Sequence, residues 1–97
     1  MGIIENEHEI VFLADGEFIT SNIRHIEAEI MEYVDKSEKD IVIDMSNQTK
    51  IDSMAIAALI RIKNKLIDKG RGFKIINPGM GVTRVLEISG LENFLLE

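Results

Sequence analysis

Two kinds of apolar pattern alternate along the chain. Short apolar runs rich in Ile, Val and Phe are typical of β-strands, and segments with apolar residues spaced three and four apart predict amphipathic helices. The strand-like runs are Glu9–Ala14, Asp40–Met45 and Phe73–Ile76. In the first helical segment the spaced residues are Ile23, Ile26, Ile30 and Val34. The order strand, helix, strand, helix, strand, helix predicts a mostly parallel sheet connected by right-handed crossovers.

Polar residues and glycines mark the expected ends of the helices. The N-cap candidates for the first helix are Thr20, Ser21 and Asn22. Asp52 and Ser53 precede a second helix, expected over Met54–Lys69, and one of the two glycines that follow is expected to end it in the left-handed conformation. A third helix is expected from about residue 81 to residue 89. The loop 46–53 then lies beyond the carboxyl end of a strand, where α/β sheets usually carry their functional residues.

The remaining segments complete the predicted fold. Ile3 and Ile4 are expected to form a strand that returns through a hairpin turn around Asn6, and Phe94–Leu96 offers either a last edge strand or a packed tail. The apolar run within Asp40–Met45 lacks polar alternation, which predicts a strand covered by helices on both faces. We therefore expect one α/β domain across all 97 residues, with a mostly parallel sheet of four to five strands and three to four helices.

Charge and composition exclude several functional classes. The net charge of −6 argues against nucleic acid as the main partner, because binding to phosphates needs a basic face. Basic residues recur on one helical stripe, Arg61, Lys65 and Lys69, which we interpret as a solvated face rather than a docking patch. The absence of cysteine favours a reducing compartment, the N-terminus does not resemble a signal peptide, and the longest apolar stretch is too short to span a bilayer. We expect a cytoplasmic protein.

The chain offers few candidates for catalysis. It contains no glycine-rich phosphate loop, and its two histidines, His8 and His25, have no apparent nucleophile or second metal ligand beside them. Asp44 and Asp52 lack a recognisable ligand spacing, and Asp44 is expected to hydrogen-bond a neighbouring loop. We therefore expect no catalytic residues, no metal and no cofactor.

The segment Ile41–Ala58, IVIDMSNQTKIDSMAIAA, carries a resemblance to a known family. Its residues 44–46 (Asp-Met-Ser) and 52–53 (Asp-Ser) resemble the signature of STAS domains of the anti-sigma factor antagonist type. There, a strand ending in Asp-Leu-Ser leads to Asp-Ser-Ser-Gly at a helix start. The likeness extends from about Gly16 to Leu96. The chain departs from the pattern at Met54 and at Ala55, which stand in place of the second serine and the glycine.

The resemblance implies a small α/β module that works by binding proteins. Its expected partners are a serine kinase that doubles as an anti-sigma factor and a serine phosphatase that reverses the kinase, in bacterial transcription regulation. The residue expected to be phosphorylated is Ser53. A phosphate there would meet the free N–H groups of a helix start, so the added charge would alter a partner-facing surface without unfolding the domain. The residues expected to contact the partner are Asp52, Met54, Ile56, Thr20, Ser21 and Asn22.

Other interpretations remain open at this point. Ser53 alone is also a favoured N-cap residue, and capping needs no phosphorylation. A STAS domain also occurs as a non-catalytic subunit of a larger assembly, such as a lipid ABC transporter or a stress-signalling complex, in which Ser53 would be mainly structural. A small enzyme or phosphocarrier of similar layout would need a catalytic His, a Cys or a phosphate loop.

Overall fold

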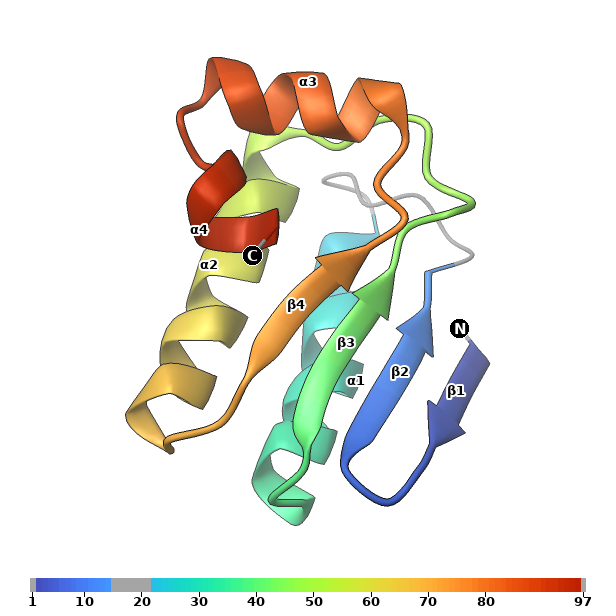
Figure 1. The fold of residues 1–97 in the computed structure, drawn as a ribbon, viewed down its shortest axis with the longest axis vertical. Helices are drawn as coiled ribbons and strands as arrows, with labels where there is room; N and C mark the ends of the chain where they lie inside the picture. The colour runs from blue at the N-terminus through green and yellow to red at the C-terminus, as the bar shows by residue number, and fades with distance from the viewer. Residues whose placement is uncertain (1, 15–21, 97) are drawn as a thin grey trace.

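Four strands form one mixed sheet in the order β1-β2-β3-β4 (Figure 1). The structure is a computed structural model that describes residues 2–14 and 22–96. Its elements are β1 (Gly2–Glu5), β2 (Glu9–Leu13), α1 (Ile23–Lys36), β3 (Asp40–Asp44), α2 (Ser53–Asp68), β4 (Phe73–Ile76), α3 (Met80–Ile88) and α4 (Glu92–Leu96). β2, β3 and β4 run parallel and β1 pairs antiparallel with β2. The single-domain α/β fold and its mostly parallel sheet are as predicted.

The hairpin between β1 and β2 is closed by Asn6. The side-chain oxygen of Asn6 accepts hydrogen bonds from the backbone N–H groups of His8 (3.1 Å) and Glu9 (2.9 Å), and the N–H of Asn6 donates to the carbonyl of Glu9 (3.0 Å). Asparagine favours such turns because its short side chain can satisfy the backbone two or three residues further on. The expected hairpin around this residue is confirmed.

The core lies between one face of the sheet and the helices α1 and α2, which run side by side behind it in Figure 1. The register aligns Ile10 with Ile41 and Ile41 with Phe73, so the same face of three strands is apolar. The strand residues of this face are Ile10, Phe12, Ile41, Ile43, Phe73 and Ile75, and all are buried. From α1, Ile30 and Val34 pack against them, as the spacing of three and four predicts.

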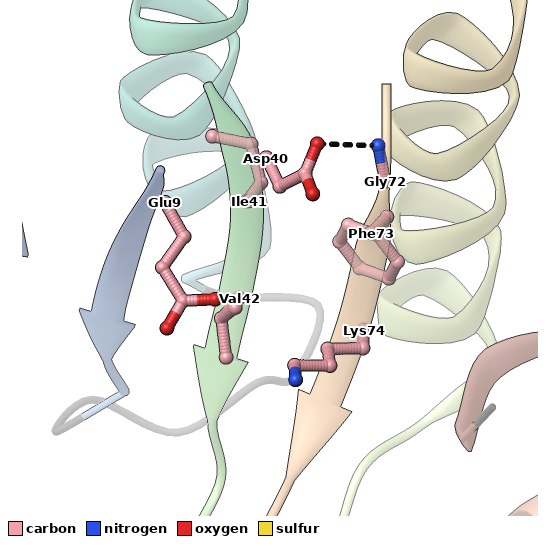
Figure 2. A pocket seen from close by; sticks show the side chains of 7 residues that line it. All are labelled: Glu9, Asp40, Ile41, Val42, Gly72, Phe73 and Lys74. Atoms are coloured by element: carbon pink, nitrogen blue, oxygen red, sulfur yellow. Dashed lines mark hydrogen bonds between the residues drawn. The ribbon is translucent and has the colours of Figure 1, made fainter. Parts of the chain in front are cut away.

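The opposite face of the sheet is not covered by any of the described helices, which corrects the expectation for β3 (Figure 1). Val42 points to this face and is nevertheless only 1% exposed. Figure 2 shows the reason: Glu9 from β2 and Lys74 from β4 reach toward Val42 from either side, along a shallow pocket of about 170 Å³. Long charged side chains often cover apolar surface with their stems in this way. The apolar run of β3 therefore does not require helices on both faces.

Helix α2 ends in a left-handed glycine as expected. Gly70 has φ +69°, its N–H bonds the carbonyl of Ile67 (2.9 Å), and the N–H of Arg71 bonds the carbonyl of Leu66 (2.8 Å). This pair of bonds is the Schellman arrangement, in which glycine avoids the steric cost of a positive φ. Of the two glycines that follow α2, Gly70 and not Gly72 is therefore the left-handed residue that ends the helix.

The C-terminal segment forms the short helix α4, so the expected alternative of an edge strand at Phe94–Leu96 is wrong. Leu95 is fully buried, and Lys63 of α2 lies 4.6 Å from the centre of the Phe94 ring and donates to the Phe94 carbonyl. A five-residue helix is too short to be stable by itself. Its contacts with β4, α3 and α2 therefore hold it in place.

The basic stripe of α2 lies along helix α1. Arg61 forms two hydrogen bonds to the carboxylate of Glu27 (2.7 and 2.8 Å), and the ammonium of Lys65 lies 3.1 Å from a carboxylate oxygen of Asp35. The hydrogen bonds to Glu27 are the main reason that the pKa of Arg61 is raised. The stripe was interpreted as a solvated face. Its residues are partly exposed, but two of them form ion pairs between the helices.

Candidate functional site

Helix α2 begins at the sequence signature, and Asp52 is its N-cap. Asp52 has an extended backbone (φ −111°, ψ 179°), and its carboxylate accepts a hydrogen bond from the N–H of Ala55 (2.9 Å). Its own carbonyl accepts the first helical bond, from the N–H of Ile56 (3.0 Å). This is the standard role of aspartate at a helix start, where the carboxylate also complements the helix dipole.

Ser53 is the first residue of α2 and is exposed. The interpretation of Ser53 as a plain N-cap is therefore wrong, because Asp52 occupies that position. The first two N–H groups of a helix, here those of Ser53 and Met54, have no partner within the helix itself. A hydroxyl at this position thus stands on the surface beside backbone donors that suit an anion.

The loop that leads to Ser53 is held by inward side chains at every third residue. Met45, Gln48 and Ile51 are buried, whereas the residues between them are exposed. The N–H of Met45 bonds the carbonyl of Ile76 (2.9 Å), which fixes the loop to the end of β4. The start of α2 is therefore positioned by a loop with three anchor points in the interior.

Gln48 helps to position the candidate site, which the sequence analysis missed. It is only 5% exposed, and its side-chain amide donates to the carbonyl of Ala14 (2.8 Å), immediately after β2. A buried amide without partners costs free energy, so this bond ties the signature loop to the β2 end of the sheet. The available signal was its spacing, three residues after Met45 and three before Ile51.

A second missed contributor is the start of helix α3, which packs directly on the same loop. A Cβ atom placed on Gly81 would lie 2.0 Å from the carbonyl oxygen of Thr49, and one on Gly79 would lie 3.3 Å from that of Gln48. Only glycine at position 81 allows the helix to approach so closely. The glycines on both sides of Met80 were the signal in the sequence.

Asp44 and Asp52 do not form a pair but serve different backbone groups. The carboxylate of Asp44 accepts from the N–H of Ser46 (2.9 Å) and from the side-chain amide of Asn77 (3.4 Å). The bond to Ser46 is the main reason that the pKa of Asp44 is lowered. Asp44 therefore stabilises the start of the loop, as expected. Within residues 2–14 and 22–96, no three His, Cys, Asp or Glu side chains gather as a metal site would require.

The predicted contact residues differ in how much surface they offer. Met54 is 45% exposed and Asp52 is half-buried, but Ile56 is only 8% exposed and belongs to the core. Ile56 therefore has little area left for the predicted contact with a partner, because its side chain packs inside the domain. Asn22 is exposed at the N-cap of α1, without a side-chain capping bond. Thr20 and Ser21 lie outside the described residues.

Residues 3–96 match the family model of the STAS domain. The chain belongs to the STAS domain family. The match begins at the second residue of β1 and ends with α4, so the resemblance of the signature loop extends to the whole fold.

Two solved structures share this fold with the STAS domain at low sequence identity. The candidate anti-sigma factor antagonist TM1081 from Thermotoga maritima superposes with a TM-score of 0.91 at 18% identity, covering 98% of this chain and 82% of that one. The anti-sigma factor antagonist SpoIIAA in its unphosphorylated form gives a TM-score of 0.83 at 18% identity, covering 98% and 84%. At such identities the likeness concerns the fold.

Curated relatives of this STAS domain are much longer proteins. Sulfate transporter 2.1 of Arabidopsis thaliana is 34% identical over 71 residues, which are 60% of this chain and 10% of the transporter. Low affinity sulfate transporter 3 of Stylosanthes hamata is 24% identical over 92 residues, or 82% of this chain and 14% of that protein. Among the described residues of the STAS domain itself, no helix has the length and apolar character needed to traverse a bilayer.

Proposed function

We propose that this STAS domain is a partner-switching regulator of the anti-sigma factor antagonist type. In its unmodified form it binds a serine kinase that also acts as an anti-sigma factor, and phosphorylation of Ser53 by that kinase releases it. A serine phosphatase restores the binding form. The domain itself acts by binding and has no catalytic role.

The observation that carries the proposal is the exposed position of Ser53 as the first residue of α2. A kinase needs the hydroxyl at the surface, on backbone that can enter its active site. The N-cap bond is made by Asp52, so modifying Ser53 leaves the bond between Asp52 and Ala55 intact. The fold shared with SpoIIAA and TM1081 supports the same role.

The switch works through charge rather than through refolding. Phosphorylation adds close to two negative charges at pH 7, and the N–H groups at the helix start and the helix dipole favour an anion there. The new charge lies next to the Asp52 carboxylate and the half-exposed Met54. An unpaired charge buried against a partner costs a few kcal/mol, or roughly a hundredfold in affinity.

The direct test is phosphorylation in vitro. The purified domain is incubated with the kinase/anti-sigma factor of the same organism and ATP, and modified residues are mapped by mass spectrometry. We expect one phosphate on Ser53 in the wild type and none in Ser53→Ala. Modification of another residue, or no transfer by a kinase that binds the domain, contradicts the switch.

The charge mechanism is tested by binding measurements on matched variants. Ser53→Asp is expected to weaken kinase binding at least tenfold in calorimetry, and Ser53→Ala to bind as the wild type does. Asn64→Asp is the control, because it adds the same charge at an exposed position further along α2. We expect it to change affinity less than twofold. Equal affinities of Ser53→Asp and wild type, with unchanged far-UV circular dichroism, would count against the mechanism.

A second candidate function is a subunit or domain of a larger transport or stress-signalling assembly. The observation in its favour is that both curated relatives are sulfate transporters, of which the matching stretch is 10% and 14%. In that role Ser53 is structural, and the Asp and Ala variants bind the assembly equally well. Transporter genes beside its own gene, rather than kinase and phosphatase genes, would point the same way.

A further inference from the structure

Strand β1 is the edge of the sheet that has no neighbour among the described residues. The strand order places β1 and β4 at the two edges, and helix α4 packs against β4 (Figure 1). β1 lies at the opposite edge, away from all four helices in Figure 1. An open edge presents main-chain donors and acceptors to any strand that can pair with it.

The hairpin geometry tells which backbone groups of β1 face outward. Asn6 and Glu9 form a hydrogen-bonded pair, since the N–H of Asn6 bonds the carbonyl of Glu9. Such pairs alternate along antiparallel strands, so Ile4 is bonded to Val11 and Gly2 to Leu13. The N–H and C=O groups of Ile3 and Glu5 therefore point away from the sheet.

The side chains of this strand give its edge little protection beyond one charge at its end. Natural edge strands often carry lysine, proline or a bulge that discourages pairing. β1 has the sequence GIIE with no bulge, and its Ile4 is 54% exposed on the open face of the sheet. Its one charge, Glu5, is held by Lys39 at 2.8 Å. The edge thus combines outward-facing backbone groups with an apolar residue at its centre.

We propose that two copies of this chain pair through their β1 strands, antiparallel and about a two-fold axis at Ile4. In this register Ile3 of each copy lies opposite Glu5 of the other, and these pairs exchange the outward N–H and C=O groups. The two Ile4 side chains meet directly, at the close spacing of a non-hydrogen-bonded pair. The two sheets become one continuous sheet.

The strand is self-complementary in charge as well as in shape. The register sets Glu5 opposite an isoleucine and not opposite the second Glu5, so no like charges face each other across the axis. A second copy supplies the matching Ile4 that an unrelated strand need not have. Because the two-fold axis pairs the β1 edge of one copy with the β1 edge of the other, the pairing closes at a dimer and does not continue into a fibre.

The dimer is expected to be weak and to tighten with salt. A four-residue strand buries less than the roughly 1,200 Å² typical of stable complexes. Each copy also carries a net charge of −6, and the long-range repulsion between copies is screened as ionic strength rises. The Ser53 site lies at the start of α2, so both copies of a dimer keep it exposed and this inference does not depend on the proposed function.

Sedimentation equilibrium over about 10 µM to about 1 mM protein measures the pairing. We expect a monomer–dimer equilibrium whose dissociation constant rises at least tenfold in Ile4→Lys. Ile88→Lys is the matched control, because Ile88 is 77% exposed on α3 and far from the edge. We expect it to leave the dissociation constant within twofold. A monomer at all concentrations, or equal effects of the two variants, would overturn the proposal.

A cross-link tests the register without depending on affinity. The chain has no cysteine, so Ile4→Cys introduces a single thiol, and a cross-strand pair at this spacing lies within disulfide reach. With oxidised glutathione we expect Ile4→Cys to form disulfide-linked dimers at least tenfold faster than Ile88→Cys. Equal rates for the two variants would contradict the register, and unchanged circular dichroism verifies that both are folded.

Discussion

At both ends of the parallel strands, hydrogen bonds between side chains and backbone join neighbouring segments. The two ends differ in which side chains stay exposed. At the amino ends, Arg71 donates to the carbonyls of Lys39 and Val34, and Asp40 accepts from the N–H of Gly72 (2.8 Å). There the side chains of Arg71 and Asp40 join neighbouring segments. At the carboxyl ends, Gln48 performs the joining, and Ser53 remains on the surface. The carboxyl ends therefore keep a candidate site, because one residue anchors the loop there and a different residue stays exposed.

At the carboxyl end, the backbone of α3 lies close to the backbone of the signature loop. We therefore expect this end to be more sensitive to added side-chain atoms than the amino end. Gly81→Ala forces a Cβ to 2.0 Å from the carbonyl of Thr49, so either α3 or the loop must move. We expect the free energy of unfolding in urea to fall by about 2–3 kcal/mol. Gly79→Ala, whose Cβ would lie 3.3 Å from the Gln48 carbonyl, is expected to cost less than about 1 kcal/mol. Equal losses would show that the close approach is unimportant.

The amino end is tested by removing the donors of Arg71. Arg71→Met keeps an unbranched side chain but leaves the carbonyls of Val34 and Lys39 without their partner. We expect a loss of about 1–2 kcal/mol in urea unfolding, with no effect on kinase binding. The control is Lys69→Met at the exposed end of α2, for which a change within about 0.5 kcal/mol is expected. Weakened kinase binding by Arg71→Met would contradict the separation of the two ends.

The smallest expected effect is a pH dependence at Asp44. Its pKa is lowered in the folded state, mainly by the bond from Ser46, so the carboxylate stabilises the fold above its unfolded pKa near 3.8. This stabilisation is lost as the pH falls through the lower, folded pKa. Asp44→Asn is expected to cost about 0.5 kcal/mol at pH 7, a small value because the group lies near the surface, and progressively less as the pH falls below about 3.8. A difference between wild type and variant that does not shrink as the pH falls would refute this origin.

Much of the fold was predictable because the signals are local. Strand and helix periods arise from neighbouring residues, so the predicted order of elements and the hairpin around Asn6 agree with the structure. Errors arose where burial depends on distant residues. Val42 is covered by side chains of two other strands rather than by a helix, and α4 forms because it packs against β4, α3 and α2.

The candidate site divides in the same way. Asp52 and Ser53 were recognisable because a capping residue and the turn that follows it are contiguous in sequence. The burial of Ile56 and the anchoring by Gln48 could not be recognised in the sequence, because they depend on how α2 and the loop pack against the rest of the domain. The bond from Gln48 joins residues 34 apart in sequence.

The sequence by itself therefore determined the element order, the start of α2 and the serine at that start, because these depend on spacing within a few residues. Only the tertiary structure decided that Gln48 and Gly81 support this serine, and that no other described strand pairs with the outer edge of β1. Such properties arise when segments far apart in the chain come together, and no local pattern records which backbone will lie against which.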